Sequence, residues 1–184
     1  MHSAESASEW VCRWTHLIPP NGTVLDVACG AGRHLRWLHT HGRTVTGVDR
    51  NAQLLASNAH LGEMVCADLE NGPWPFTGRV FDTVLVTNYL WRPLMATIVS
   101  SVAPSGLLIY ETFALGNEKV GRPARPEFLL EPAELLRACA ELRVVAFEEG
   151  FLEGPDRFVQ RIVAAREPDV ALGPHRYPLS RRAS

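Results

Sequence analysis

Short apolar runs rich in β-branched residues alternate along the chain with stretches whose apolar positions recur at helical spacing. Strands that alternate with helices of ~10 residues are typical of βαβ units and a parallel sheet. The strands are expected at residues 23–28, 44–49, 64–68, 81–87 and 107–112. The helices between them are expected at 33–41, 52–59 and 93–102. The pattern therefore predicts an α/β fold with three layers and a doubly wound, mostly parallel sheet.

The last third of the chain has a different pattern. Residues 131–142 predict a helix with Pro132 in its first turn. The apolar runs 143–149 and 157–165 flank Gly154-Pro155-Asp156, which predicts a C-terminal antiparallel hairpin.

The whole chain of 184 residues is expected to form a single domain, because no repeat or linker divides it. Its expected parts are an N-terminal helix in residues 1–19, a core at 20–166 and a tail at 167–184. Trp10 and Trp14 recur at helical spacing in the first part. We expect this helix to pack on the body, although it could also cover a pocket.

Composition and charge exclude several classes of protein. Hydrophobic residues make up 46% and charged residues 21%, which is ordinary globular usage and excludes a disordered or collagen-like chain. A net charge of -2 leaves no basic excess for a polyanion, so nucleic acid is not an expected partner. The 4 cysteines lack metal-binding spacing, so no metal site is expected.

The same features suggest where the protein works. Sparse cysteine suits a reducing compartment. The N-terminus has no apolar signal-like region, and no apolar run approaches the ~20 residues that cross a bilayer. We therefore expect a cytoplasmic protein without membrane contact, and its oligomeric state stays open.

A polar residue stands at or near the C-terminal end of each predicted parallel strand. These residues are Asp26, Asp49, Asp68, Asn88 and Glu111. In open α/β sheets, ligands bind outside the carboxyl ends of the strands. Any one of the five residues could instead cap a helix or form a turn. Their repetition favours a ligand site at this edge.

A glycine turn follows the first predicted strand. Gly30-Ala31-Gly32 opens a helix, as a nucleotide-binding turn does, although Leu35 occupies the position of a third glycine. Asp49, at the end of the second strand, can accept two hydrogen bonds from a ribose diol. The chain's single lysine, Lys119, lies outside this turn, which argues against nucleotide hydrolysis.

Four ordered segments resemble the motifs of class I S-adenosylmethionine-dependent methyltransferases. The segments are Val24–Arg33, Val45–Asp49, Cys66–Leu69 and Phe81–Asn88. The match continues through Leu94–Tyr110 and covers about residues 20–113, with Ala28 at a position where the first motif often has glycine. The chain is similar to small single-domain members such as the tellurite-resistance and thiol methyltransferases. The resemblance implies a Rossmann-like methyltransferase fold, S-adenosylmethionine as the cofactor and S-adenosylhomocysteine as its product.

The resemblance also implies residue roles at the methionine end of the cofactor. Gly30 and Gly32 would let the backbone approach the methionine portion, and Asp26 would support that turn and the amino group. Asn88 and Tyr89 would flank the departing methyl group. Tyr89 could instead pack beneath the following helix.

At the adenosine end, Asp49 would hold the ribose hydroxyls and Asp68 would accept a hydrogen bond from the adenine amino group. Leu69 would pack on the adenine ring, or it could simply belong to the core. The implied cofactor-binding residues are Asp26, Ala28, Gly30, Gly32, Asp49, Arg50, Asp68, Leu69 and Asn88.

The candidate catalytic residues are Asn88, Tyr89 and Glu111. Methyl transfer needs a general base only if the acceptor must lose a proton. Glu111 is the best candidate for that base, although it could equally cap a loop. Tyr110 and His34 also lie near the expected site, and His34 is expected to be solvated in the first turn of its helix.

The acceptor is expected to be a small molecule. The run Asn88–Pro93 departs from the Asn/Asp-Pro-Pro-aromatic run that is frequent in methyltransferases acting on amino groups of bases or glutamine. Residues 113–130 should overhang the site, because long unstructured segments are usually functional or disordered. Arg122 and Arg125 in this segment could bind an anionic acceptor or remain in solvent.

The sequence thus predicts an enzyme that moves a methyl group from S-adenosylmethionine to a small-molecule acceptor by in-line displacement. Two alternatives remain open at this point. An NAD-dependent oxidoreductase would also use the glycine turn and Asp49, but Asp26 lies where such strands are usually apolar. A cofactor-binding subunit that stabilises a catalytic partner would carry the same motifs without catalysis.

Overall fold

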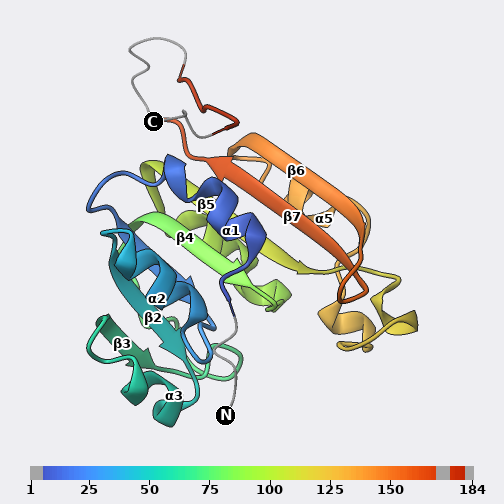
Figure 1. The fold of residues 1–184 in the computed structure, drawn as a ribbon, viewed down its shortest axis with the longest axis horizontal. Coiled ribbons are helices and arrows are strands. Elements are labelled where there is room, and N and C mark those ends of the chain that lie inside the picture. Colours follow the sequence, from blue (N-terminus) through green and yellow to red (C-terminus); the bar gives the residue numbers. More distant parts are fainter. Residues whose placement is uncertain (1–5, 169–174, 181–184) are drawn as a thin grey trace.

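A seven-stranded sheet forms the centre of the computed structural model, which describes residues 6–168 and 175–180. The strands follow the order β3-β2-β1-β4-β5-β7-β6 (Figure 1). Strands β1 to β5 pair in parallel, and β7 pairs antiparallel with both β5 and β6. The strands are β1 (Thr23–Val27), β2 (Thr44–Asp49), β3 (Gly62–Cys66), β4 (Phe81–Thr87), β5 (Val102–Phe113), β6 (Arg143–Leu152) and β7 (Arg157–Ala165). The mostly parallel sheet and the C-terminal hairpin are both confirmed.

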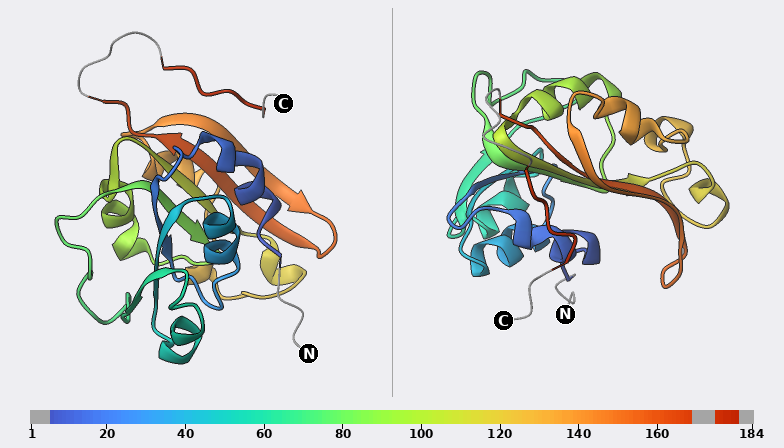
Figure 2. Two further views of the ribbon diagram at one scale, coloured as in Figure 1. Left: turned by 60° about the vertical axis from the view of Figure 1, so that its left-hand side comes forward. Right: turned by 90° about the horizontal axis from the view of Figure 1, so that it is seen from above.

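Helices cover both faces of the sheet, which completes the three predicted layers (Figure 2). They are α1 (Glu9–Trp14), α2 (Arg33–Thr40), α3 (Ala52–Ser57), α4 (Met95–Ser100) and α5 (Glu134–Ala138). Leu35 of α2 and Leu55 of α3 lie in one apolar cluster, together with Trp10 and Trp14 of α1. The α4 and α5 helices contribute to a second cluster on the opposite face. Both tryptophans of α1 are 1% exposed, so this helix packs on the body as expected.

Local sequence signals explain where the first helices begin and end. The apolar side chains of α2 recur at helical spacing, and Gly42 then turns the chain with φ +73°. Asn51 caps α3, because its side chain accepts hydrogen bonds from the backbone N–H groups of Gln53 and Leu54.

Several predicted boundaries are wrong. The helix expected near the N-terminus is divided into α1 and a 3-10 turn at Thr15–Leu17, and its first expected residues lie outside the described chain. The helix expected at 131–142 is confined to α5. Ala133 directly before it has φ +55°, outside the helical region, and its N–H donates a hydrogen bond to Glu149 of β6. Strand β5 begins at Val102, before the expected boundary, because Val102 already pairs with Phe81 of β4.

In the part of the chain that the structure describes, no helix is long and apolar enough to cross a membrane.

Gln160 of β7 fastens α5 to the sheet. Its side chain is 0% exposed. Its Oε1 accepts a 3.1 Å hydrogen bond from the Leu135 N–H, and its Nε2 donates to the Glu131 carbonyl. The same Nε2 group lies 3.2 Å from a carboxylate oxygen of Glu149 on β6. One buried amide therefore satisfies backbone groups at the start of the short helix.

We expect Gln160→Leu to lower the free energy of unfolding by about 2–4 kcal/mol, because two backbone groups lose their partner. Urea denaturation measures this change. The matched control is Gln53→Leu on the exposed surface of α3, which should stay within about 0.5 kcal/mol of the wild type. Equal effects of the two substitutions would show that the buried amide does not hold α5.

Candidate functional site

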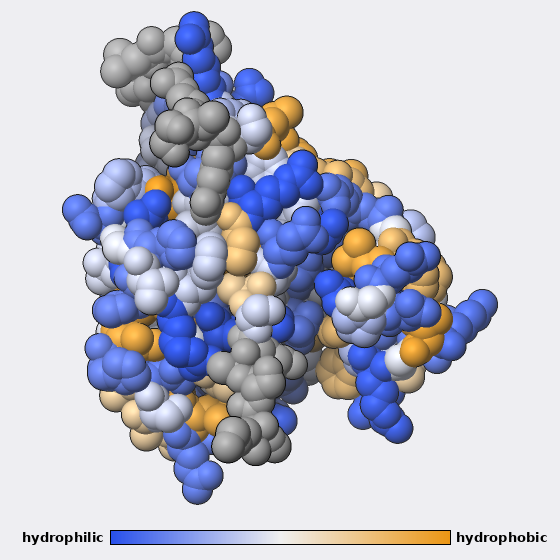
Figure 3. Space-filling view, in the orientation of Figure 1, coloured by the Kyte–Doolittle hydropathy of each residue, from blue (hydrophilic) through white to orange (hydrophobic). Residues whose placement is uncertain are grey.

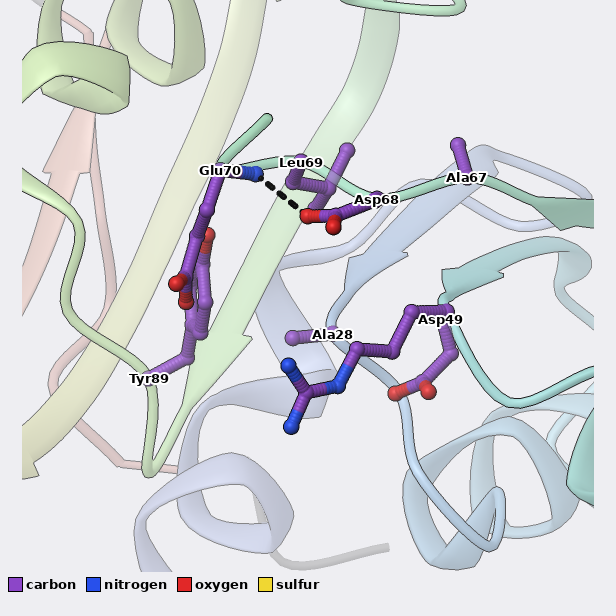
Figure 4. A pocket seen from close by; sticks show the side chains of 8 residues that line it. Ala28, Asp49, Ala67, Asp68, Leu69, Glu70 and Tyr89 are labelled. Atoms are coloured by element: carbon purple, nitrogen blue, oxygen red, sulfur yellow. Dashed lines mark hydrogen bonds between the residues drawn. The ribbon is translucent and has the colours of Figure 1, made fainter. Parts of the chain in front are cut away.

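The order of the strands reverses between β1 and β4, and a cavity lies at the carboxyl ends of the strands beside this point. We call it the strand-edge cavity, and its volume is about 200 Å³. It is lined by Ala28, Asp49, Arg50, Ala67, Asp68, Leu69, Glu70 and Tyr89 (Figure 4). Most of the implied cofactor residues thus come together at one place. Ala67 and Glu70 were not singled out in the sequence, although they flank Asp68 and Leu69.

Asp49 joins the end of β2 to the glycine turn. Its Oδ2 accepts a 2.8 Å hydrogen bond from the Gly30 N–H, and its Oδ1 accepts a 2.9 Å bond from the Asn51 N–H. A carboxylate has about four acceptor positions, so Asp49 can still accept bonds from a ligand in the cavity.

The turn after β1 depends on left-handed backbone conformations. Gly30 has φ +53° and Gly32 has φ +75°. A Cβ on Gly32 would lie 2.7 Å from the Asn58 side chain, whereas a Cβ on Gly30 would meet nothing within 4 Å. Gly30 therefore leaves open space that a ligand can enter. Ala28 also has φ +55°. This conformation favours glycine, which is the residue often found at the corresponding position of the resembled first motif.

Asp26 lies beneath this turn and has no partner among the described residues. It is 0% exposed, and neither of its carboxyl oxygens has a hydrogen bond. Burial raises the pKa of Asp26 to about 8; the charge of Arg33 lowers it and that of Asp49 raises it further. A buried carboxyl group without a partner is the group that a cationic ligand would satisfy.

Asp68 and Tyr89 lie on different sides of the strand-edge cavity (Figure 4). Asp68 Oδ1 accepts a 3.0 Å bond from the Glu70 N–H, and its Oδ2 accepts a 3.0 Å bond from Asn71 Nδ2. The Asn71 and Glu70 bonds lower the pKa of Asp68. The Tyr89 hydroxyl is buried without a partner, and burial raises the pKa of Tyr89. Leu69 lines the cavity and also belongs to the apolar core.

Glu111 is buried at the end of β5 and is bonded on both carboxylate oxygens. Its Oε1 accepts a 2.7 Å bond from the Ser8 hydroxyl, and its Oε2 lies 3.4 Å from Arg161. Arg161 also pairs with Glu148 at 2.6 Å. The N-terminal segment and the hairpin therefore meet at Glu111. Tyr110 next to it donates a 2.9 Å bond to the Tyr89 carbonyl and so holds the end of β4.

His34 is not solvated, so that expectation is wrong. Its side chain is 1% exposed, its Nε2 accepts a 3.2 Å bond from the Ser8 N–H, and its Nδ1 lies 3.3 Å from the Thr87 hydroxyl. Burial, with the Arg33 charge, lowers the pKa of His34 to about 3, so the ring is neutral near pH 7. Its position four residues before the buried Leu38 was a signal for this orientation.

Two further cavities lie beside Asn88, which has φ +55° directly after β4. The outer cavity, of about 390 Å³, extends from Ser8 and Arg33 to Arg122 and the turn of the hairpin. The aromatic cavity, of about 300 Å³, is lined by Arg50, Glu70, Asn88, Tyr89, Leu90, Thr112, Phe113, Pro123 and Phe128. Asn88 and Phe113 belong to both cavities. Arg125 pairs with Glu127 and lines neither of them.

Within the described residues, no group of three or more His, Cys, Asp or Glu side chains is arranged to hold a metal ion.

Known proteins resemble this chain in fold more than in sequence. The structure of TehB from Haemophilus influenzae superposes with a TM-score of 0.65 at 20% identity, covering 83% of this chain and 60% of that one. This chain therefore spans 60% of the length of that relative. A TehB-like S-adenosylmethionine-dependent methyltransferase from Corynebacterium glutamicum has a TM-score of 0.61 at 19% identity, covering 83% and 86%. An S-adenosylmethionine-dependent methyltransferase from Methanosarcina mazei has a TM-score of 0.66 at 15% identity, covering 90% and 100%.

The comparison of the sequence with protein families finds similarity to a methyltransferase domain. No curated protein matches the chain significantly in sequence. Residues 24–106, which span β1 to the middle of β5, match the family described as a methyltransferase domain. Over these residues the chain is similar to a methyltransferase domain, and it shares the fold of the S-adenosylmethionine-dependent methyltransferases named above.

Proposed function

We propose that this methyltransferase binds S-adenosylmethionine across the strand-edge cavity and methylates a small-molecule acceptor in the neighbouring cavities. The observation that supports the proposal most directly is the buried, unpartnered carboxyl group of Asp26 beneath the open turn at Gly30. Cavities of about 390 Å³ and 300 Å³ suit a small acceptor. The net charge of -2 gives no general attraction for nucleic acid.

The residues present fit this cofactor at each of its parts. Asp26 would hold the ammonium group, and the open turn at Gly30 would accommodate the methionine backbone. Asp49 would accept bonds from the ribose hydroxyls in addition to its two backbone bonds. Asp68 and Leu69 would hold the adenine at the far end of the cavity.

The cofactor supplies a methyl group on a positively charged sulfur, which is a good leaving group. The acceptor atom donates a lone pair to the methyl carbon while the carbon–sulfur bond breaks and its electrons remain on sulfur. The protein contributes by aligning the reacting groups and excluding water. Asn88, at the junction of the outer and aromatic cavities, and Tyr89, with its unpartnered hydroxyl, are the residues placed to align the acceptor.

The bonds of Glu111 affect its proposed role as a general base. Both oxygens already accept bonds, from Ser8 and from Arg161, and the residue is 4% exposed. A proton on a bound acceptor therefore has little access to this carboxylate. We therefore favour an acceptor whose reacting atom carries a free lone pair at neutral pH and needs no base.

We expect Gly30→Ala to weaken the binding of S-adenosylhomocysteine by at least about tenfold, since the added Cβ fills the space above the turn. The measurement is isothermal titration calorimetry. Gly42→Ala is the matched control, because Gly42 also has a positive φ and nothing within 4 Å of its Cβ, but lies on the turn after α2. Both variants should lose about 1–2 kcal/mol of stability, and the control should keep its affinity.

Two results would contradict the proposal. Unchanged affinity in Gly30→Ala would show that the turn does not hold the cofactor. Binding of NAD, with no binding of S-adenosylmethionine or S-adenosylhomocysteine, would indicate a different enzyme class.

The raised pKa of Asp26 gives the affinity a pH dependence. With a pKa of about 8, Asp26 is mostly protonated at pH 6 and ionises as the pH rises. A bound ammonium group favours the ionised form, so binding should release a proton below pH 8. We expect the affinity for S-adenosylhomocysteine to rise by up to about tenfold per pH unit from pH 6 to pH 8. Calorimetry in buffers of different ionisation enthalpy measures the released proton.

The raised pKa of Asp26 also predicts how the stability of the cofactor-free protein depends on pH. The folded state holds the Asp26 proton between pH 4 and pH 8 while the unfolded chain has lost it, so stability falls as the pH rises through this window. Asp26→Asn removes this effect. Its stability relative to wild type should increase from pH 5.5 to pH 8 by at most about 1.4 kcal/mol per pH unit, and its cofactor binding should be weakened. A constant difference in urea denaturation would show that Asp26 is not protonated in the fold.

A further inference from the structure

The segment between β5 and α5 forms a fixed wall beside the site. Ala114 and Leu130 form a β-bridge that joins its two ends. Asn117 is 1% exposed; it donates a 3.0 Å bond to the Pro123 carbonyl and accepts a 3.2 Å bond from the Phe158 N–H on β7. The overhanging segment predicted from the sequence is thus held in place by internal bonds. Figure 3 shows hydrophobic surface on the lobe at the right of the view. Leu115 and Val120 of this segment are exposed hydrophobic residues.

The aromatic and outer cavities lie against this wall and differ in character. Phe113, Pro123 and Phe128 give the aromatic cavity its apolar surface. This cavity also shares Tyr89 with the strand-edge cavity. More charged residues line the outer cavity, among them Arg122 from the wall and Arg157 from the hairpin. A molecule that occupies both cavities would pass Asn88 at their junction.

Two arginines of the outer cavity differ from most others in the fold. The side chains of Arg122 and Arg157 have no ion pair or hydrogen bond with any residue in the described ranges. By contrast, Arg92 holds Glu134 at 2.7 Å, and Arg125, near Arg122 on the wall, holds Glu127. A guanidinium group without a partner presents several donors in a planar fork that matches a carboxylate.

The acidic residues at the outer cavity do not cancel the charges of Arg122 and Arg157. The acidic lining residues are Asp156 and Glu111, and Glu111 is already paired with Arg161 from behind. The cavity therefore attracts an anion, although the whole chain carries a net charge of -2.

We infer that the acceptor is a small organic carboxylate, with its carboxylate group between Arg122 and Arg157 and its apolar body in the aromatic cavity. This inference rests on the proposed function and adds the substrate class. The apolar body gains from contact with Phe113, Pro123 and Phe128, and the charged group keeps it in one orientation. The wall would contact both ends of the acceptor, through Arg122 at the carboxylate and through Pro123 and Phe128 at the apolar body. The internal hydrogen bonds of the wall keep these residues in position.

The test uses probes that separate charge from shape. Benzoate, 3-phenylpropionate and octanoate are titrated into the full-length protein by calorimetry, with and without saturating S-adenosylhomocysteine. Each is compared with its neutral amide, and selenite serves as an inorganic oxyanion. We expect at least one carboxylate to bind about tenfold or more tightly than its amide, because the charged hydrogen bonds are lost in the amide.

Substitutions then locate the binding site. Arg122→Gln and Arg157→Gln should each weaken binding of that carboxylate about tenfold and leave the affinity for S-adenosylhomocysteine unchanged. Arg125→Gln is the matched control, since it removes the same charge from the same wall outside both cavities. This control should bind the carboxylate as the wild type does.

The possible results distinguish this inference from the proposed function. If S-adenosylhomocysteine binds but no carboxylate is preferred over its amide, the inference is overturned and the proposed function stands. If selenite binds as tightly as the best carboxylate, or Arg125→Gln weakens binding as much as Arg157→Gln, the inference is also overturned. If the carboxylate preference and its loss in the two variants are seen without any cofactor binding, the cavity assignment stands and the proposed function fails.

Discussion

The carboxylate of Asp49 connects the parts of the proposed cofactor site. It ends β2, accepts the Gly30 N–H of the turn after β1, and accepts the Asn51 N–H at the start of α3. These bonds fix the position of the turn relative to the second strand before any ligand binds. Asp26 lies buried beneath this glycine turn, and the turn leaves open space at Gly30. Cofactor binding can therefore use a prepared surface, which reduces the entropy lost on binding.

The N-terminal segment closes the other side of the site through a chain of polar contacts. Ser8 bonds to His34 by its backbone and to Glu111 by its side chain. Arg161 pairs with both Glu111 and Glu148. Glu148 also pairs with Arg13 of α1 at 3.0 Å. The α1 helix thus packs on the sheet through its buried tryptophans, and Ser8 directly before it lines the outer cavity. Packing and site formation depend on the same segment.

The sequence predicted the sheet well, and it singled out six of the eight residues that line the strand-edge cavity, because the signals there are local. Residues 23–49 contain a buried strand, a glycine turn, an amphipathic helix and a second strand, each with a clear period. The acceptor side depends on contacts between residues far apart in the chain. The pairing of Glu111 with Ser8 has no local pattern, and the spacing of His34 and Leu38 indicates only the face of α2 on which His34 lies, not its contact with Ser8. The wall between β5 and α5 looked irregular for the same reason, because Asn117 is fixed by a strand that comes later.

The contrast between the two buried carboxyl groups indicates how the site divides its work. Asp26 is buried without a partner, so it remains available for a cation that arrives from solution. Glu111 is buried with two partners, so its charge is already balanced within the protein. A site that balances its one candidate base internally favours reaction by orientation rather than by proton transfer. The unpartnered side chains of Arg122 and Arg157 are consistent with this division, since under the proposal they would orient an anionic acceptor by charge with its reacting atom beside Asn88.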